Sequence, residues 1–100
     1  MDSYPINKLR ARITAGRRAA TLLNNADVMD ALTDLRTTFV DRWARSPTST
    51  DPTEVRKRDD LHRMVRTIDS LIKRFENAVA DGDRAEQLLD DMEKLSNARN

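Results

Sequence analysis

Apolar residues recur at alternating spacings of three and four along four stretches of this chain. The clearest row lies in the second half of the sequence and consists of Leu61, Val65, Ile68, Ile72, Phe75 and Val79. Residues three and four apart lie on the same side of an α-helix, because one turn takes 3.6 residues. The pattern therefore predicts an all-α protein in which each helix buries one side.

The first half of the sequence predicts two consecutive helices. The first spans residues 4–24, with Ser3 as its N-cap and Pro5 in its first turn, where the missing N–H of proline costs nothing. The second spans residues 27–45, and Asn24-Asn25 before it indicates a stop or a kink. The two apolar rows are Ile6, Leu9, Ile13, Gly16, Ala20, Leu23 and then Val28, Leu32, Leu35, Phe39, Trp43.

A loop rich in proline and hydroxyl residues, residues 46–51, divides the chain nearly in half. Asp51 is a strong N-cap and Pro52 suits the first helical position. Glu54 follows three residues after the cap, so its carboxylate is expected to accept a hydrogen bond from the cap's own N–H. The third helix is therefore predicted to begin at Pro52 and to run to about Asp81.

Gly82 is predicted to end this helix in the left-handed conformation that glycine adopts readily. Asp83 with Glu86 then repeats the capping pattern and opens a short fourth helix. The result is an antiparallel helical hairpin whose arms, residues 4–45 and 52–97, are each broken once. This three- or four-helix bundle would form a single domain over residues 1–100. The row of the fourth helix is Ala85, Leu88, Leu89, Met92, Leu95.

The composition leaves little material for a core. Of 100 residues, 38% are apolar and only four are aromatic, so part of the apolar surface is expected to be covered by another copy or by a partner protein. The chain has no cysteine, which excludes disulfides and thiolate metal sites. No apolar run approaches the length of a membrane span. The expected location is the cytoplasm.

Charge is unevenly distributed along the chain. Residues 1–24 hold five cations and one carboxylate, whereas residues 81–95 hold six carboxylates and two cations. In a hairpin these two segments lie at the same end. The preferred interpretation is attraction within one molecule, which contributes little for each exposed pair. Head-to-tail pairing between copies is the alternative.

Basic residues raise the alternative of a nucleic-acid-binding packaging or regulatory protein. Against it stand a net charge of only +1 and the absence of a helix-turn-helix pattern. Asp59 and Asp60 also follow the second basic group directly. The side chains that would contact phosphates are Arg10, Arg12, Arg17, Arg18, Arg56, Lys57 and Arg58.

Residues with catalytic or metal-binding chemistry are scarce. His62 is the only histidine, and Asp59 three residues before it would need a second such pair to hold a metal ion. Asp90 and Asp91 are adjacent and point in different directions on a helix, so they do not form an acid–base pair. No catalytic residue, metal site or cofactor is therefore predicted.

Leu9, Arg10 and Ile13 near the start of the chain and the turn at residues 51–54 form two further local motifs. The first resembles the start of the helical chorismate mutases, and the second resembles a turn motif of the same family. The resemblance implies a small helical chorismate-mutase-like enzyme whose arginines clamp a dicarboxylate. The arginine of the turn motif and the downstream lysine are absent from this chain, which puts the enzyme interpretation in doubt.

A longer resemblance covers about residues 39–90. Its four features are Trp43 before a Ser-Pro break, the Asp51-Pro52 cap, the apolar row from Leu61 to Ile68 and the Gly82 stop. Together these features are similar to those of short helical proteins of tailed phages and prophages. The resemblance implies a phage accessory or virion-assembly protein without catalytic activity. Its location would then be the host cytoplasm or the virion.

The sequence as a whole favours a non-enzymatic helical protein–protein interaction module that forms homo-oligomers. Trp43, Phe39 and Leu35 are the predicted interface residues, because large side chains at the end of the second helix are conspicuous in a chain with few aromatics. Phe39 is expected to contribute mainly to the core. Trp43 fits either the core or an interface.

Overall fold

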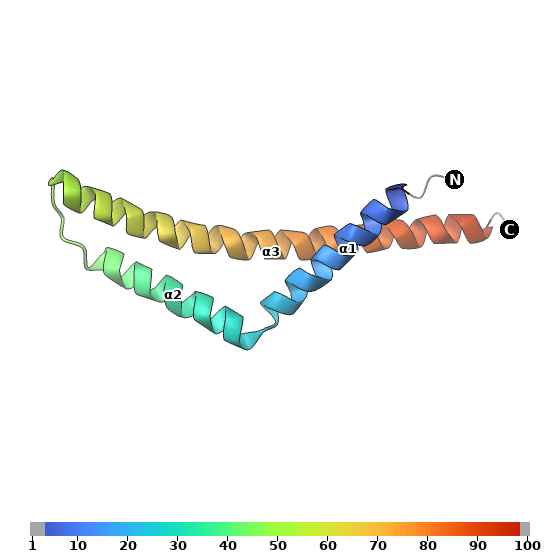
Figure 1. Cartoon of the computed structure of the whole chain (residues 1–100), viewed down its shortest axis with the longest axis horizontal. Helices are drawn as coiled ribbons and strands as arrows, with labels where there is room; N and C mark the ends of the chain where they lie inside the picture. The colour runs from blue at the N-terminus through green and yellow to red at the C-terminus, as the bar shows by residue number, and fades with distance from the viewer. Residues whose placement is uncertain (1–3, 99–100) are drawn as a thin grey trace. The chain divides into compact units, whose positions relative to one another are not determined.

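The computed structural model describes residues 4–98, which form three α-helices and no strand. The helices are α1 (Tyr4–Leu23), α2 (Ala26–Ala44) and α3 (Pro52–Ala98) (Figure 1). The prediction of an all-α protein is confirmed. Pro5 lies in the first turn of α1 as predicted, whereas Ser3 lies outside the described residues.

The break between α1 and α2 occurs at the two predicted asparagines. The last turn of α1 closes with the Asn24 N–H donating to the Ala20 carbonyl over 3.0 Å. Asn25 then has an extended backbone, and its side-chain oxygen accepts a hydrogen bond from the Val28 N–H at 3.1 Å. Asn25 is thus the N-cap of α2, which satisfies a backbone donor that the helix itself leaves unpaired.

The start of α3 at Pro52 is also as predicted, but its capping differs in one bond. The Thr53 N–H donates to the Asp51 carboxylate at 3.1 Å, which is the expected cap. The predicted hydrogen bond from the Asp51 N–H to Glu54 is wrong. That N–H donates instead to Ser49 Oγ at 3.0 Å, because this hydroxyl lies only two residues before it in the loop. Glu54 pairs with Lys57 at 3.7 Å.

The predicted stop at Gly82 is wrong. The helix α3 continues through this residue to Ala98, so the second arm is unbroken and no separate fourth helix exists among the described residues. None of the glycines in residues 4–98 has a positive φ. A glycine ends a helix only where it adopts the left-handed conformation. Gly82 stays helical and is buried, and Asp83 and Glu86 lie within the helix.

The chain divides into two compact units, each containing part of α3. Unit 1 combines α1 and Asn24 with α3 from Arg74 onwards, and unit 2 is Asn25–Lys73. The hairpin arrangement of the two arms stays a prediction.

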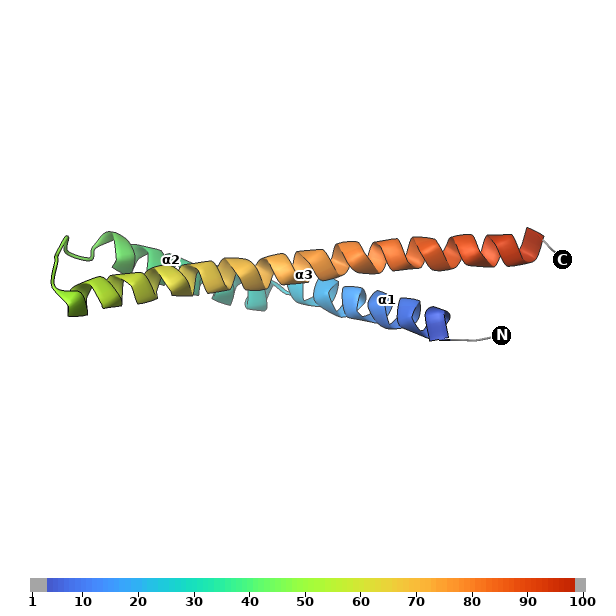
Figure 2. The same cartoon turned by 90° about the horizontal axis from the view of Figure 1, so that it is seen from above.

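In unit 1, α1 runs antiparallel to the second half of α3. Ile6 near the start of α1 lines a cavity with Met92, whereas Ala20 near its end lines one with Val79. Figure 2 shows α1 alongside this part of α3. The core of the unit consists of Leu9, Ile13 and Ala85, with Leu89 packed against it.

In unit 2, α2 runs antiparallel to the first half of α3. Arg36 pairs with Asp69, and Trp43 further along α2 lies beside His62 earlier on α3. Ile68 is the most buried apolar side chain of this unit, at 5% exposed. No large side chain among the described residues is fully buried, so two helices alone build a thin core in each unit.

Candidate interaction surface

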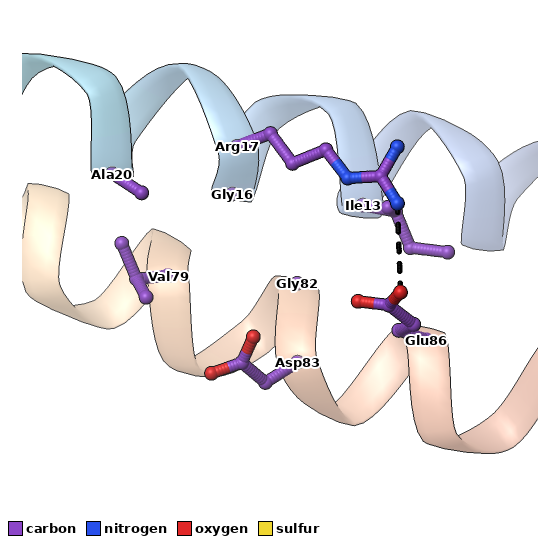
Figure 3. Close-up of a pocket in the computed structure, with 8 residues that line it drawn as sticks. All are labelled: Ile13, Gly16, Arg17, Ala20, Val79, Gly82, Asp83 and Glu86. Atoms are coloured by element: carbon purple, nitrogen blue, oxygen red, sulfur yellow. Dashed lines mark hydrogen bonds and ion pairs between the residues drawn. The ribbon is translucent and has the colours of Figure 1, made fainter.

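The helices of unit 1 touch through their backbones at two glycines. A Cβ placed on Gly16 would lie 2.9 Å from both the Ala78 carbonyl oxygen and the Gly82 Cα. A Cβ on Gly82 would lie 3.0 Å from the Gly16 Cα and 3.2 Å from the Arg12 carbonyl oxygen. Any side chain at either position would force the helices apart. Figure 3 shows the two glycines facing each other.

Ion pairs lie on either side of this glycine contact. Arg12 donates two hydrogen bonds to Asp81, at 2.8 and 3.0 Å, and these bonds hold the pKa of the Asp81 carboxyl below its ordinary value. On the opposite side, Arg17 lies 3.5 Å from Glu86 (Figure 3). The basic segment and the acidic segment therefore attract each other within one molecule, in line with the preferred interpretation of the charge pattern.

A small cavity of about 70 Å³ lies next to the glycine contact. Pockets that bind small molecules are usually several times larger, at about 300–1,000 Å³. The cavity is bordered by small side chains on one side and by the Arg17–Glu86 pair on the other (Figure 3). It is best explained as a packing gap left where two glycines meet, rather than as a binding site.

Three large apolar side chains are exposed on the surface of unit 2. Leu35 is 44% exposed, Met64 43% and Leu71 40%. On α3, Met64, Ile68 and Leu71 follow each other at spacings of four and three, so they form one row. We call Leu35, Met64 and Leu71 the apolar side of unit 2.

The apolar side and the polar contacts of unit 2 occupy opposite flanks of the helix pair. In an antiparallel pair, residues turned the same way from the buried and half-buried residues of each helix share a flank. Leu35, Met64 and Leu71 are all turned about 70–90° one way from those residues. Asp69 and His62 are turned the other way, and there Arg36 donates to Asp69 at 2.7 and 3.2 Å.

The predicted interface residue Trp43 lies in a small aromatic and cationic cluster. Its side chain is 37% exposed, its ring centroid is 6.1 Å from that of His62, and the Arg58 guanidinium carbon lies 5.2 Å from the ring. Arg58 over the ring is a cation–π contact. Phe39 is half-buried and Leu35 is exposed. Trp43 thus contacts its own unit while leaving over a third of its surface open.

The predicted phosphate-contacting residues are divided between the two units, and four of the seven have a partner within the chain. Arg12 and Arg17 are occupied by Asp81 and Glu86, and Lys57 lies near Glu54. Arg58 covers the Trp43 ring. The remaining three are exposed, with Arg10 and Arg18 in unit 1 and Arg56 in unit 2. Most of this set therefore already has a partner within the chain.

Neither a metal-binding group nor a membrane-spanning segment is found in the described part of the chain. Residues 4–98 contain no group of three or more histidine and acidic side chains arranged to hold a metal ion. Within the same residues, none of the helices combines the length and the apolar content needed to cross a bilayer. His62 contacts the Trp43 ring instead of joining an acidic cluster.

Two features of these surfaces were missed by the sequence analysis. The partnership of Gly16 with Gly82 was missed because Gly82 carries the local signal of a helix stop. The row formed by Met64, Ile68 and Leu71 was missed because Ile68 also belongs to the row that contains Val65. A search for a second row through the same helix would have found it, since the spacing of four and three is visible in the sequence.

Comparison with protein-family models, with curated proteins and with solved structures found no match to this chain.

Proposed function

We propose that this chain is a non-enzymatic protein–protein interaction module that associates with another copy of itself. The observation that supports the proposal is the apolar side of unit 2, where three large side chains are each at least 40% exposed. Clustered apolar side chains of this kind mark interaction surfaces more often than isolated exposed ones do. Association would give this two-helix unit the third layer that its own sequence does not supply.

The size of the expected gain is consistent with weak to moderate association. Full burial of a leucine or methionine stabilises by about 1.5–3 kcal/mol, so covering the exposed fraction contributes roughly 1 kcal/mol for each side chain. In a two-fold symmetric dimer each of these side chains is buried once in each copy, so its contribution to the free energy of association counts twice. Side-chain ordering and lost rotational freedom oppose this gain. We therefore expect an equilibrium between monomer and oligomer that depends on concentration.

The narrower form of the proposal is a role in the assembly of a tailed-phage particle. It rests on the resemblance of residues 39–90 to short phage proteins. An assembly protein of that kind would be expected to associate with itself at the concentrations reached in an infected cell. The resemblance indicates the biological context of the association, and the apolar side of unit 2 is the surface through which the copies would associate.

The proposal is tested by measuring the solution mass of the parent chain over a range of concentrations by light scattering. Leu35→Gln and Leu71→Gln should each lower the mass towards that of the monomer. The unfolding midpoint extrapolated to low concentration should change little, because these side chains are already substantially exposed.

A matched control is Val55→Gln. Val55 belongs to the same unit and is 41% exposed, but helical spacing turns it towards the flank opposite to the apolar side. This variant should keep the mass of the parent. A parent chain that stays monomeric at every concentration would contradict the proposal, as would equal losses for all three variants.

A further inference from the structure

Charged side chains lie along the whole of α2, with Asp27, Asp30 and Asp34 in its first half and Arg36, Asp41 and Arg42 in its second. Asp27 lies in its first turn and Arg42 in its last, and Arg45 follows as the C-cap. Acidic residues near the start of a helix and basic residues near its end also suit the helix dipole. Two such helices laid side by side bring Asp27 of one next to Arg42 and Arg45 of the other only if they run in opposite directions.

Leu35 stands at the centre of this arrangement. It is the tenth of the 19 residues of α2, and it is the only residue of α2 on the apolar side of unit 2. Val28 lies seven residues before it and Arg42 seven after, which is about two helical turns in each direction. The three residues therefore lie nearly in line along one side of α2, with Leu35 halfway between a half-buried valine and an exposed arginine.

We infer that two copies of this chain pair through α2 in antiparallel orientation, with a two-fold axis at Leu35. This inference rests on the proposed self-association and specifies its geometry. Leu35 of one copy packs on Leu35 of the second. Arg42 of the second copy lies over Val28, where its aliphatic stem covers the valine and its guanidinium reaches Asp27.

The positions along the helix axes support these partners. Asp27 lies about 12 Å before Leu35, at 1.5 Å per residue, whereas Arg42 lies about 10.5 Å and Arg45 about 15 Å after it. Reversing one helix about Leu35 places the aspartate of one copy between the two arginines of the other. Asp27 and Arg45 are both turned about 80° from Leu35 in the same direction, so they share a flank in the antiparallel pair. The two-fold axis forms this contact twice.

Parallel pairing would bring like charges together. Arg42 would then lie beside Arg42 of the second copy, and Asp27 beside Asp27. Like charges placed opposite each other oppose association and direct it towards another orientation. Antiparallel pairing about Leu35 brings Asp34, next to the axis, close to its own counterpart, but Asp27 then meets Arg42 and Arg45 at both ends of the contact. The end charges therefore favour the antiparallel pair over the parallel one.

The test is a charge exchange between two variants of the full chain. Asp27→Arg places three cations at each contact, and Arg42→Asp places two carboxylates there. Each variant alone should self-associate at least about tenfold more weakly than the parent. An equimolar mixture should associate again, because one contact then pairs the two exchanged charges and the other keeps the parent's pair. Sedimentation of each sample and of the mixture measures these outcomes.

Asp30→Arg is the matched control. It reverses the same kind of charge on the same helix, but Asp30 is turned about 140° away from Leu35, so self-association should match that of the parent. Circular dichroism on all variants checks that α2 remains folded, since reversed end charges weaken a helix slightly.

Three results would overturn the inference. In the first, both variants associate as strongly as the parent, which removes the antiparallel contact but leaves the proposed self-association standing. In the second, the folded variants are monomeric and their mixture stays monomeric. In the third, the parent itself is monomeric, in which case the proposed function fails as well.

Discussion

Gly16 sets how closely two helices of unit 1 approach each other. Replacing it by alanine would raise helix propensity by about 1 kcal/mol. The new Cβ would, however, lie 2.9 Å from backbone atoms of α3, which cannot rotate away as a side-chain end can. Overpacking of this kind costs about 1–3 kcal/mol. We expect Gly16→Ala to lower the free energy of unfolding in denaturant titration, despite the better propensity.

The control for this substitution is Ala11→Gly, at an exposed position of the same helix. It should cost about 1 kcal/mol through propensity alone. A Gly16→Ala variant more stable than the parent would show that the backbones can separate without loss, and that the glycine contact does not determine the packing.

Ile68 and Ile72 are neighbours in the predicted row, but they differ in burial. Ile68 is 5% exposed, whereas Ile72 is half-buried. Ile68→Ala should therefore cost about 2–5 kcal/mol and Ile72→Ala distinctly less, because the cost of truncation grows with the burial of the removed atoms and with the cavity left behind. Denaturant midpoints of the two variants measure this difference. Equal midpoints would show that the packing around Ile68 is not special.

Trp43 is suited to both the core and an interface, and one substitution distinguishes these roles. If the open part of its ring contacts a second copy, Trp43→Ala should weaken self-association more than it lowers the unfolding midpoint. Sedimentation and thermal unfolding on the same samples compare the two effects. A variant with the parent's mass and a much lower midpoint would assign Trp43 to the core alone.

At the scale of elements, the helices of each unit are joined by a bidentate arginine–aspartate pair. Hydrogen bonds from Arg12 and Arg36 lower the pKa of Asp81 and Asp69, respectively, from the ordinary value of 3.8. The unfolded chain therefore binds more protons than the folded chain between the lowered and ordinary values. The stability from these pairs is present above about pH 4 and is lost as the pH falls through the lowered values.

We accordingly expect the free energy of unfolding to fall between about pH 6 and about pH 3, and to fall less in Asp81→Asn than in the parent. Chemical denaturation at both pH values measures the difference. Asp59→Asn, at an exposed position of α3, is the control and should keep the pH dependence of the parent. Identical pH dependence in the parent and Asp81→Asn would show that the Arg12–Asp81 pair does not contribute.

At the scale of the whole molecule, the nearly equal numbers of positive and negative charges argue against binding to nucleic acid. The net charge is +1, and Arg12 and Arg17 are already paired with carboxylates. We expect no tight binding to duplex DNA at physiological salt, measured by fluorescence anisotropy. Submicromolar binding that weakens steeply with salt and is lost in an Arg10→Glu, Arg18→Glu variant would establish the nucleic-acid alternative instead.

The sequence determined the features that depend on nearby residues. The helix boundaries at Asn25 and Pro52 follow from caps that bond within three residues. The all-α class follows from apolar spacing along single helices. The residues proposed for the contact between copies were predicted only in part. Leu35 was selected for its size. The spacing of Met64 and Leu71 is visible in the sequence, but their exposure depends on which flank of α3 faces α2.

The tertiary structure decided what depends on residues far apart in the chain. Gly82 carries the same local signal as a helix stop, yet it stays helical, because Gly16 meets it from a helix more than sixty residues earlier. Ile68 is buried whereas Ile72 is partly exposed, and Arg36 pairs with Asp69. These features likewise depend on where α2 lies. Local hydrogen bonding fixes where a helix begins, but packing between helices decides whether a glycine ends it and which side of it stays open.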